Sequence, residues 1–208
     1  MAHTRCMRQT TRWEAKTTAD PDHSRWYVER FRRMVASGAD LAGEARMIDA
    51  MIPRGSRVLD GGCGPGRVGA ELAARGHTVV GVDVDPLLIE AAAADHPGSR
   101  WLVGDLAELN LSAQGVLGTF DIAVVAGNVM TFLAPGSEIE VLRRLGAHVG
   151  TEGRVVVGFG SGRGYPFEDF FADVAAAGLA VDAAFATWDL RPFTPGSTFL
   201  VAILSASA

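Results

Sequence analysis

The chain has 208 residues, of which 48% are hydrophobic and 21% charged, and its formal net charge at pH 7 is -5. This composition is typical of a globular domain and excludes a disordered chain. The acidic balance gives no reason to expect a nucleic acid or another polyanion as a partner. The length suits one ordinary domain with a full hydrophobic core.

Residues 1–22 are polar and carry few apolar anchors, so we expect a flexible amino-terminal segment. Its positive charges are not followed by an apolar stretch, and the longest apolar runs are far too short to cross a bilayer. A cytoplasmic protein without membrane contact is therefore expected. The two cysteines, Cys6 and Cys63, show no metal-ligand or redox spacing, so no metal site is predicted.

Two helices are predicted within residues 23–52. The first starts near His23, has its apolar residues on one face, and is ended by Gly38. The second covers Leu41–Ile52 and stops before a proline. We expect this helical pair to form a lid over a core of residues 53–208.

In the core, strands and helices alternate. The predicted strands are nearly continuous apolar runs, which is typical of strands buried on both faces of a parallel sheet. They are Arg57–Asp60, Thr78–Asp83, Arg100–Val103, Asp121–Ala126 and Arg154–Phe159, with helices at Arg67–Ala74, Pro86–Ala94, Ser137–Val149 and Phe167–Ala176. The carboxyl-terminal part instead holds two β-rich runs around "RPFTPGS", too close together for a crossover helix. The sequence thus predicts a doubly wound α/β fold that finishes in an antiparallel hairpin.

The stretch "VLDGGCGPGRVGAEL" after the first core strand can be interpreted in two ways. Gly64, Gly66 and Gly69 match the G-x-G-x-x-G spacing of a dinucleotide-binding turn. Alternatively, Asp60 followed by Gly62, Gly64 and Gly66 matches the acid and G-x-G-x-G of an S-adenosylmethionine site. In both cases glycines let the backbone turn tightly and a helix amino terminus faces the ligand. The glycines alone leave the cofactor undecided.

Three acids at the ends of successive strands favour S-adenosylmethionine. Asp83 suits the ribose of either cofactor. Asp60 would repel the phosphates of a dinucleotide, whereas it attracts the ammonium and sulfonium of S-adenosylmethionine. Asp105 can accept a hydrogen bond from the adenine amine while the Leu106 amide donates to a ring nitrogen. An NAD(P)-dependent oxidoreductase remains a remote alternative.

These motifs make the chain similar to the class I S-adenosylmethionine-dependent methyltransferases that act on small molecules. "VLDGGCGPG" resembles the first motif of that family, "VVGVDVDP" the second, "LVGDLAEL" the third and "FDIAVVAGNVMTFL" the fourth. The resemblance implies a Rossmann-like, mostly parallel sheet of seven strands in the order 3-2-1-4-5-7-6, with an antiparallel last strand and helices on both faces. Gly61 departs from the family pattern, which more often has an apolar residue there.

The resemblance also implies a set of cofactor-binding residues. Gly62 and Gly64 let the backbone approach the methionine and ribose parts, Asp60 neighbours the ammonium, and Asp83 binds the ribose hydroxyls. An aromatic side chain of the lid closes over the cofactor and an arginine pairs with its carboxylate. The remaining expected cofactor contacts are Gly61, Val84, Asp105, Leu106, Ala126, Gly127, Tyr27 and Arg46.

The candidate catalytic residues are His23, Tyr27 and Asn128. His23 is the first candidate for a general base, if the acceptor must lose a proton. Asn128 follows the fourth strand, where the family places the methionine end beside the substrate; a simple turn-capping role is the open alternative. Arg163 and Tyr165, in a glycine-rich loop after the fifth strand, are further candidates for substrate contact, against an ordinary surface loop.

The function expected from these features is methyl transfer to an O, N or S nucleophile of a small organic molecule. The sequence "AGNVM" is not the Asn/Asp-Pro-Pro-aromatic motif of enzymes that methylate nucleic-acid amines. The protein is expected to be a monomer or a homodimer. The main alternative is a non-catalytic S-adenosylmethionine-binding module that regulates a partner.

Overall fold

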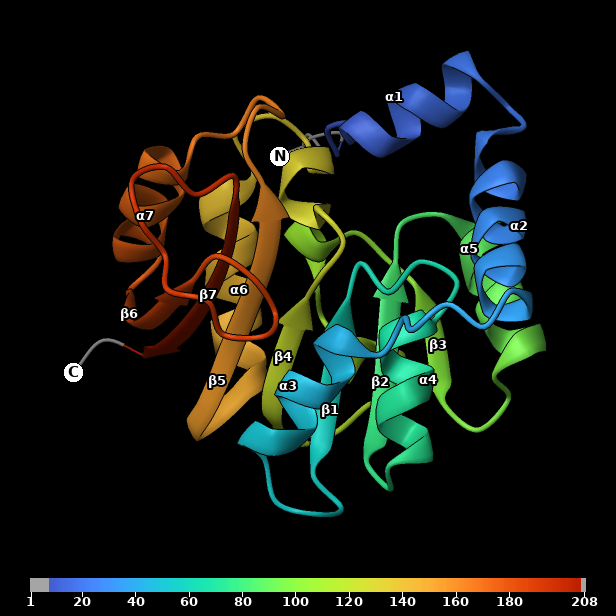
Figure 1. The fold of residues 1–208 in the computed structure, drawn as a ribbon, viewed down its shortest axis with the longest axis horizontal. Coiled ribbons are helices and arrows are strands. Elements are labelled where there is room, and N and C mark those ends of the chain that lie inside the picture. Colours follow the sequence, from blue (N-terminus) through green and yellow to red (C-terminus); the bar gives the residue numbers. More distant parts are fainter. Residues whose placement is uncertain (1–7, 207–208) are drawn as a thin grey trace, which may run out of the picture.

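The structure is a computed structural model that describes residues 8–206, built around one seven-stranded sheet (Figure 1). The strands are β1 (Arg57–Gly61), β2 (Thr78–Asp83), β3 (Arg100–Val103), β4 (Phe120–Val125), β5 (Val149–Gly160), β6 (Leu179–Phe185) and β7 (Phe199–Ala206). Their order is β3-β2-β1-β4-β5-β7-β6. Neighbours from β3 to β5 pair in parallel, and β7 runs antiparallel to β5 and β6. The predicted order and antiparallel last strand are confirmed.

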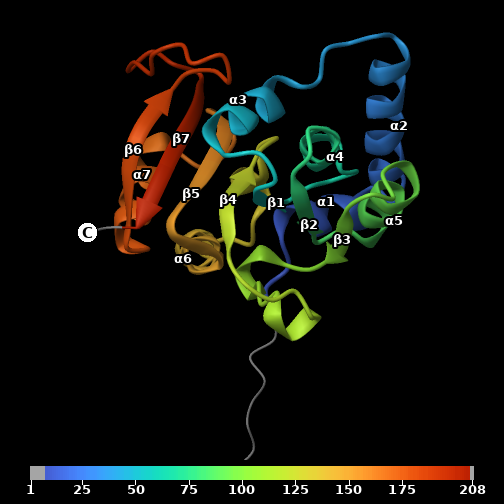
Figure 2. The ribbon, with the colours of Figure 1, turned by 90° about the horizontal axis from the view of Figure 1, so that it is seen from below.

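Helices cover both faces of the sheet (Figure 2). They are α1 (Arg12–Ala19), α2 (His23–Ala36), α3 (Gly43–Met51), α4 (Arg67–Ala74), α5 (Pro86–Asp95), α6 (Glu138–His148) and α7 (Phe167–Ala176), with short 3-10 helices η1 (Leu106–Glu108), η2 (Ser112–Gln114) and η3 (Val129–Phe132). Ile48 of α3 and Leu72 of α4 pack in one core cluster, whereas Leu145 of α6 and Phe170 of α7 pack in the other. The largest difference from the predicted boundaries is at β5, which starts at Val149, five residues before the predicted Arg154.

The amino-terminal region differs from the flexible segment expected over residues 1–22. Its described part contains α1, which begins with a complete capping box. The Thr11 hydroxyl accepts a bond from Glu14 N, and the Glu14 carboxylate accepts one from Thr11 N at 2.9 Å. Residues 1–7, with Cys6, lie outside the described part of the chain. The division into a segment 1–22, a lid and a core stays a prediction.

Helix α1 lies at the end of the sheet where the parallel strands finish (Figure 1). The Trp13 indole donates to a carboxylate oxygen of Asp85 at 2.8 Å, and the Arg12 amide donates to the carbonyl of Leu133 at 3.4 Å. These bonds connect α1 to the loops that follow β2 and β4. Helix α2 then turns back and packs on α5 through the buried Val28 and Leu88.

Three glycines allow α4 to lie close to the sheet under the indole of Trp101 in β3. A Cβ atom would be 2.9 Å from this ring at Gly66, 3.0 Å at Gly69 and 2.3 Å at Gly81. The indole N–H donates to the carbonyl of His96 at 2.8 Å, which fixes the ring. Gly69, the third glycine of the dinucleotide-like spacing, therefore serves helix–sheet packing, a role that both cofactor interpretations allow.

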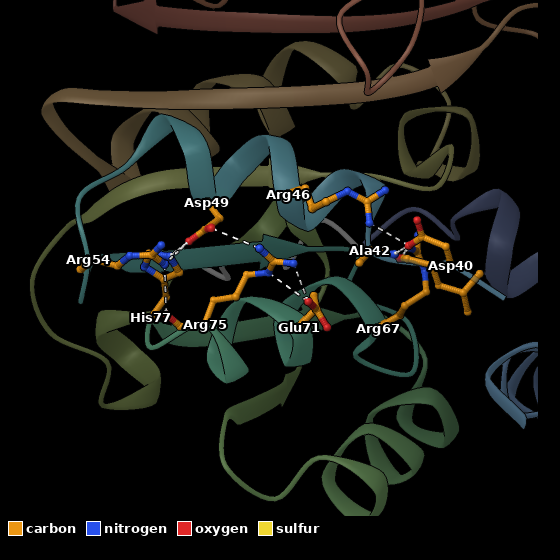
Figure 3. Close-up of polar contacts among 10 residues, drawn as sticks. Asp40, Ala42, Arg46, Asp49, Arg54, Arg67, Glu71, Arg75 and His77 are labelled. Atoms are coloured by element: carbon orange, nitrogen blue, oxygen red, sulfur yellow. Dashed lines mark hydrogen bonds and ion pairs between the residues drawn. The ribbon is translucent and has the colours of Figure 1, made fainter. Parts of the chain in front are cut away.

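A polar network joins α3 to α4 on the outer surface (Figure 3). The Asp49 carboxylate of α3 accepts bonds from Arg54 at 2.7 Å, from Arg75 at 3.2 Å and from His77 at 3.0 Å. Arg75 in turn pairs with Glu71 of α4 at 2.8 Å. The network fixes α3 beside α4 at the opposite end of β2 from Asp83.

Candidate functional site

A cavity of about 410 Å³ lies at the carboxyl ends of β1, β2, β3 and β4, beneath α1 and α2. Open α/β sheets bind their ligands at this edge. Every residue predicted to bind the cofactor or to act in catalysis lines the cavity, except Gly61 and Arg46. These residues are His23, Tyr27, Asp60, Gly62, Gly64, Asp83, Val84, Asp105, Leu106, Ala126, Gly127 and Asn128.

Asp83 joins the second strand to the glycine loop. One of its carboxylate oxygens accepts a bond from Gly64 N at 2.8 Å, and the other accepts one from Asp85 N at 2.9 Å. Burial raises the pKa of Asp83 to about 6, and these backbone donors act in the opposite direction. The carboxylate is thus held in place before any ligand binds.

Asp60 lies almost completely buried at the end of β1. Its carboxylate accepts a bond from Gly69 N at 2.8 Å, at the start of α4. Burial raises the pKa of Asp60 to about 7, while the Gly69 amide and the nearby charge of Arg67 lower it. A buried acid with a raised pKa gains from a cationic ligand, which restores the favourable interactions that the charged form lacks.

Asp105 caps a short helix and lines the cavity. One carboxylate oxygen accepts a bond from Ala107 N at 2.9 Å and so caps η1. The other accepts a bond from the Arg8 guanidinium at 2.7 Å, and Arg8 also pairs with Glu14. Asp105 nonetheless lines the cavity, so the capping bond orients its carboxylate there.

The glycine loop excludes side chains through close approach at Gly62 and through its backbone conformation at Gly62 and Gly64. At Gly62 the φ angle is +71°, and a Cβ would lie 2.4 Å from a methyl carbon of Val129. At Gly64 the φ angle is +54°, and a Cβ would lie 3.7 Å from the Tyr27 ring. Both positions need the left-handed backbone that favours glycine. The loop therefore lies between Val129 of η3 and Tyr27 of α2.

Aromatic rings from α1 and α2 close the cavity. Tyr27 meets Trp13 with ring centroids 5.4 Å apart and Phe31 at 5.0 Å, and burial raises its pKa. Trp13 also meets His23 at 5.3 Å and Phe132 at 5.5 Å. Trp13 is not among the predicted site residues, because it lies in the segment expected to be flexible. The capping sequence "TRWE" was the available signal.

Asn128 is tied to the end of β5 across the cavity edge. Its φ angle is +70°, and its side-chain oxygen accepts a bond from Gly160 N at 2.8 Å. Its backbone oxygen accepts a bond from Thr131 N, so it also begins η3. Arg163 lines the cavity, whereas Tyr165 is buried against Phe159 and donates to Asp173 at 2.8 Å. Tyr165 therefore has no substrate-contacting position.

Gly61 and Arg46, predicted as cofactor contacts, lie outside the lining of the cavity. A Cβ at Gly61 would point at core residues, 3.3 Å from Val125 and 3.5 Å from Leu106, rather than at the cavity. Arg46 pairs with Asp40 at 2.8 Å on the exposed side of α3 (Figure 3). Helix α3 buries Ala45 and Ile48 against the sheet, and this packing turns Arg46 outward. The arginines that do line the cavity are Arg30, Arg67 and Arg163.

Residues 8–206 were also searched for a metal site and for a membrane-spanning helix. No three His, Cys, Asp or Glu side chains gather there as a metal ion would require. None of the helices in this range has both the length and the apolar character needed to cross a membrane.

Comparison with known proteins places the chain in a family. A family model described as a methyltransferase domain matches residues 58–153. A TehB-like SAM-dependent methyltransferase from Corynebacterium glutamicum, known from its crystal structure, is 47% identical. That alignment covers 90% of this chain and 100% of the other, with a TM-score of 0.85.

Two further relatives are more distant. A magnesium-protoporphyrin O-methyltransferase from Rhodobacter capsulatus is 34% identical over 134 residues, which are 61% of this chain and 54% of that enzyme. The present chain thus spans about half the length of that relative. The magnesium protoporphyrin IX methyltransferase of Synechocystis, solved with bound SAM, shares the fold at 18% identity and a TM-score of 0.60, over 79% of this chain and 76% of the other. The similarity to the Corynebacterium protein and the geometry of the cavity lead to one conclusion. The chain belongs to the S-adenosylmethionine-dependent methyltransferases, and S-adenosylmethionine is its cofactor.

Proposed function

We propose that the protein transfers the methyl group of S-adenosylmethionine to an O, N or S nucleophile of a small organic molecule. The observation that carries this proposal is one cavity lined by three acids at the ends of neighbouring strands and by aromatic and amide side chains. A volume of about 410 Å³ lies near the lower end of the ~300–1,000 Å³ found for small-molecule sites. Membership of the family removes the oxidoreductase alternative.

The size of the cavity favours a compact acceptor. The Rhodobacter relative is named for a magnesium porphyrin, which is a large macrocycle. In the present chain α1 covers the cavity, and Trp13 is bonded to Asp85 while Arg12 is bonded to Leu133. A macrocycle would have to displace this helix, whereas a compact acceptor fits beneath it. We therefore propose an acceptor smaller than a porphyrin.

The cofactor supplies an electrophilic methyl group when bound, so the protein has mainly to align the acceptor and exclude water. Asp60, Asp83 and Asp105 would hold the ammonium, the ribose and the adenine. Tyr27 and Trp13 would exclude water from above. His23, whose side chain is 14% exposed, lines the cavity and can accept a proton from an acceptor that must lose one.

A non-catalytic cofactor-binding module is the second candidate. The cavity beyond the glycine loop, lined by Asn128, Phe132 and Arg163, argues against it, because a sensor of the cofactor has no need for an acceptor space. The non-catalytic candidate would prevail if a broad acceptor screen were silent while a partner copurified in a cofactor-dependent way. A cytoplasmic location and a monomeric or homodimeric state remain predictions.

Thermal unfolding tests the cofactor assignment. S-adenosylmethionine and S-adenosylhomocysteine should raise the melting temperature, because both would bind only the folded chain. At a hundredfold excess over the dissociation constant the stabilisation should be about 2.7 kcal/mol. NAD and NADP should have no effect. A shift with NAD and none with S-adenosylhomocysteine would overturn the assignment.

The affinity for S-adenosylmethionine should rise with pH. Burial raises the pKa of Asp60 to about 7, and a bound ammonium would favour the ionised carboxylate. The complex therefore holds fewer protons than the free protein, and the affinity should increase about tenfold from pH 6 to pH 8. Asp83, with a pKa of about 6, acts with the same sign at lower pH.

Isothermal titration at several pH values measures this dependence. Asp60→Asn should bind the cofactor more weakly and with a flatter pH profile above pH 6. Asp182→Asn, on the exposed side of β6, is the matched control and should follow the wild type. Equal affinities of the wild type at pH 6 and pH 8 would contradict the role of Asp60.

Substitutions of Tyr27 separate its hydroxyl from its ring. Tyr27→Phe should cost at most about tenfold in cofactor affinity, since a buried hydroxyl bond contributes ~0.5–1.5 kcal/mol. Tyr27→Ala should cost more, because the ring packs on Trp13 and Phe31 above the glycine loop. Tyr165→Phe, which loses a bond outside the cavity, should change stability and leave cofactor affinity intact. Unchanged binding in Tyr27→Ala would exclude a lid role.

Arg8 should slow cofactor release. Its guanidinium joins Asp105 to Glu14 and so holds the start of α1 over the predicted adenine position. Because Arg8 is one-third exposed, the pair is screened, and Arg8→Gln should raise the dissociation rate by only about two- to fivefold. Stopped-flow measurements can compare it with Arg25→Gln, an exposed arginine of α2 paired with Asp22 at 3.5 Å. Identical cofactor dissociation rates in the two variants would show that Arg8 does not hold α1 over the cofactor.

A further inference from the structure

One arginine of the cavity has no partner within the described residues. Arg67 pairs with Glu44 at 2.8 Å, and Arg30 lies over the Trp26 ring at 5.8 Å from its centroid. Arg163, in contrast, has neither a carboxylate within ion-pair distance nor a ring beneath it in residues 8–206. Its guanidinium donors are therefore available to a ligand.

The position of Arg163 is set by the loop after β5. The flanking residues Gly162 and Gly164 have φ angles of +70° and +79°, a backbone that side chains strain. The loop curls back over the end of β5, so that a Cβ placed on Gly160 would lie 3.6 Å from the Arg163 Nε. Two glycine-dependent bends thus bring a cation to the rim of the cavity.

Asn128 adds a second donor at the same place. The same Cβ position on Gly160 lies 3.5 Å from the Asn128 side-chain oxygen and 3.6 Å from the Phe199 ring. Because that oxygen already accepts a bond from Gly160 N, the remaining hydrogen-bonding group of the side chain is its NH2. A guanidinium and an amide NH2 therefore lie beside an aromatic ring.

The acids of the cavity lie at its other end. Those that line it are Asp60 near the end of β1, Asp83 at the end of β2 and Asp105 just after β3. The part next to β4 and β5 is lined by Val129, Phe132 and other uncharged side chains in addition to Arg163. A ligand with a negative charge is accordingly favoured near β5 and disfavoured near β2.

We propose that the methyl acceptor carries a carboxylate, which Arg163 binds with its planar guanidinium while the Asn128 amide donates a further bond. Paired donation to a carboxylate is the geometry for which a guanidinium is suited and an ammonium is not. The rings of Trp13 and Phe132, which meet edge to face with centroids 5.5 Å apart, supply an apolar surface in the same cavity for the carbon skeleton of the acceptor. Arg163 orients the acceptor and takes no part in bond formation. This inference rests on the proposed small-molecule methyl transfer.

The test uses matched acids and amides on the full chain saturated with S-adenosylhomocysteine. The pairs are benzoate and benzamide, 4-hydroxybenzoate and 4-hydroxybenzamide, and indole-3-acetate and indole-3-acetamide, each titrated by ligand-observed NMR. At least one acid should bind about tenfold or more tightly than its amide, as a charge-assisted pair requires. Arg163→Gln should abolish that preference, and Arg163→Lys should keep part of it.

Two controls separate this inference from the function on which it rests. Arg191→Gln removes an exposed arginine paired with Asp189 outside the cavity, and it should retain the full preference. Cofactor affinity and melting temperature should be unchanged in Arg163→Gln. Equal binding of acids and amides, or a preference that survives Arg163→Gln, would overturn the carboxylate proposal alone. Absence of S-adenosylhomocysteine binding would overturn both proposals.

Discussion

The bond between the Gly64 amide and the Asp83 carboxylate is the constraint on which the site depends. It joins the tip of β2 to the turn after β1, and its carboxylate partner is buried. Burying a carboxylate is costly unless backbone donors compensate, and the raised pKa of Asp83 shows that compensation is incomplete. The cavity is thus formed before the cofactor arrives, and ribose hydroxyls would supply donors that the protein withholds.

Helices α1 and α2, which cover the cavity, are held differently from the sheet. The helix residues of α1 contribute no fully buried side chain, and α1 is attached through a few polar bonds and the edge of the Trp13 ring. Asp85 receives both the Trp13 indole and the Ser24 hydroxyl, so one carboxylate connects α1 and α2 to the start of α5. Elements with few buried apolar contacts open at low free-energy cost. Helices α1 and α2 can therefore open to admit a cofactor while the sheet stays intact.

Local patterns were sufficient for the sheet and for the acids, because an apolar strand followed by an acid places that acid at a known edge. The same patterns did not predict which side chains reach the cavity when this depended on the packed face of a helix or on contacts between distant parts of the chain. Arg46 follows the buried Ala45 by one residue and is therefore turned to solvent, a difference that spacing along α3 alone did not reveal. Trp13 lies in a polar segment whose burial comes from Tyr27 and Phe132, residues distant in sequence. Tyr165 likewise lies in a pliable loop yet reaches the core.

The separation of charge along the cavity has a consequence for methyl transfer. The sulfonium of the cofactor would lie between the acids that follow β1 to β3 and the cation that follows β5. An arginine beside the sulfonium would repel it, but one at the far rim attracts an anionic acceptor from the opposite side. Under the proposed function, Arg163 would hold the acceptor on the β5 side of the cavity, away from the three acids. Fixed charges that orient both reactants cost no reorganisation when the reaction occurs, so the bends at Gly162 and Gly164 serve alignment as much as affinity.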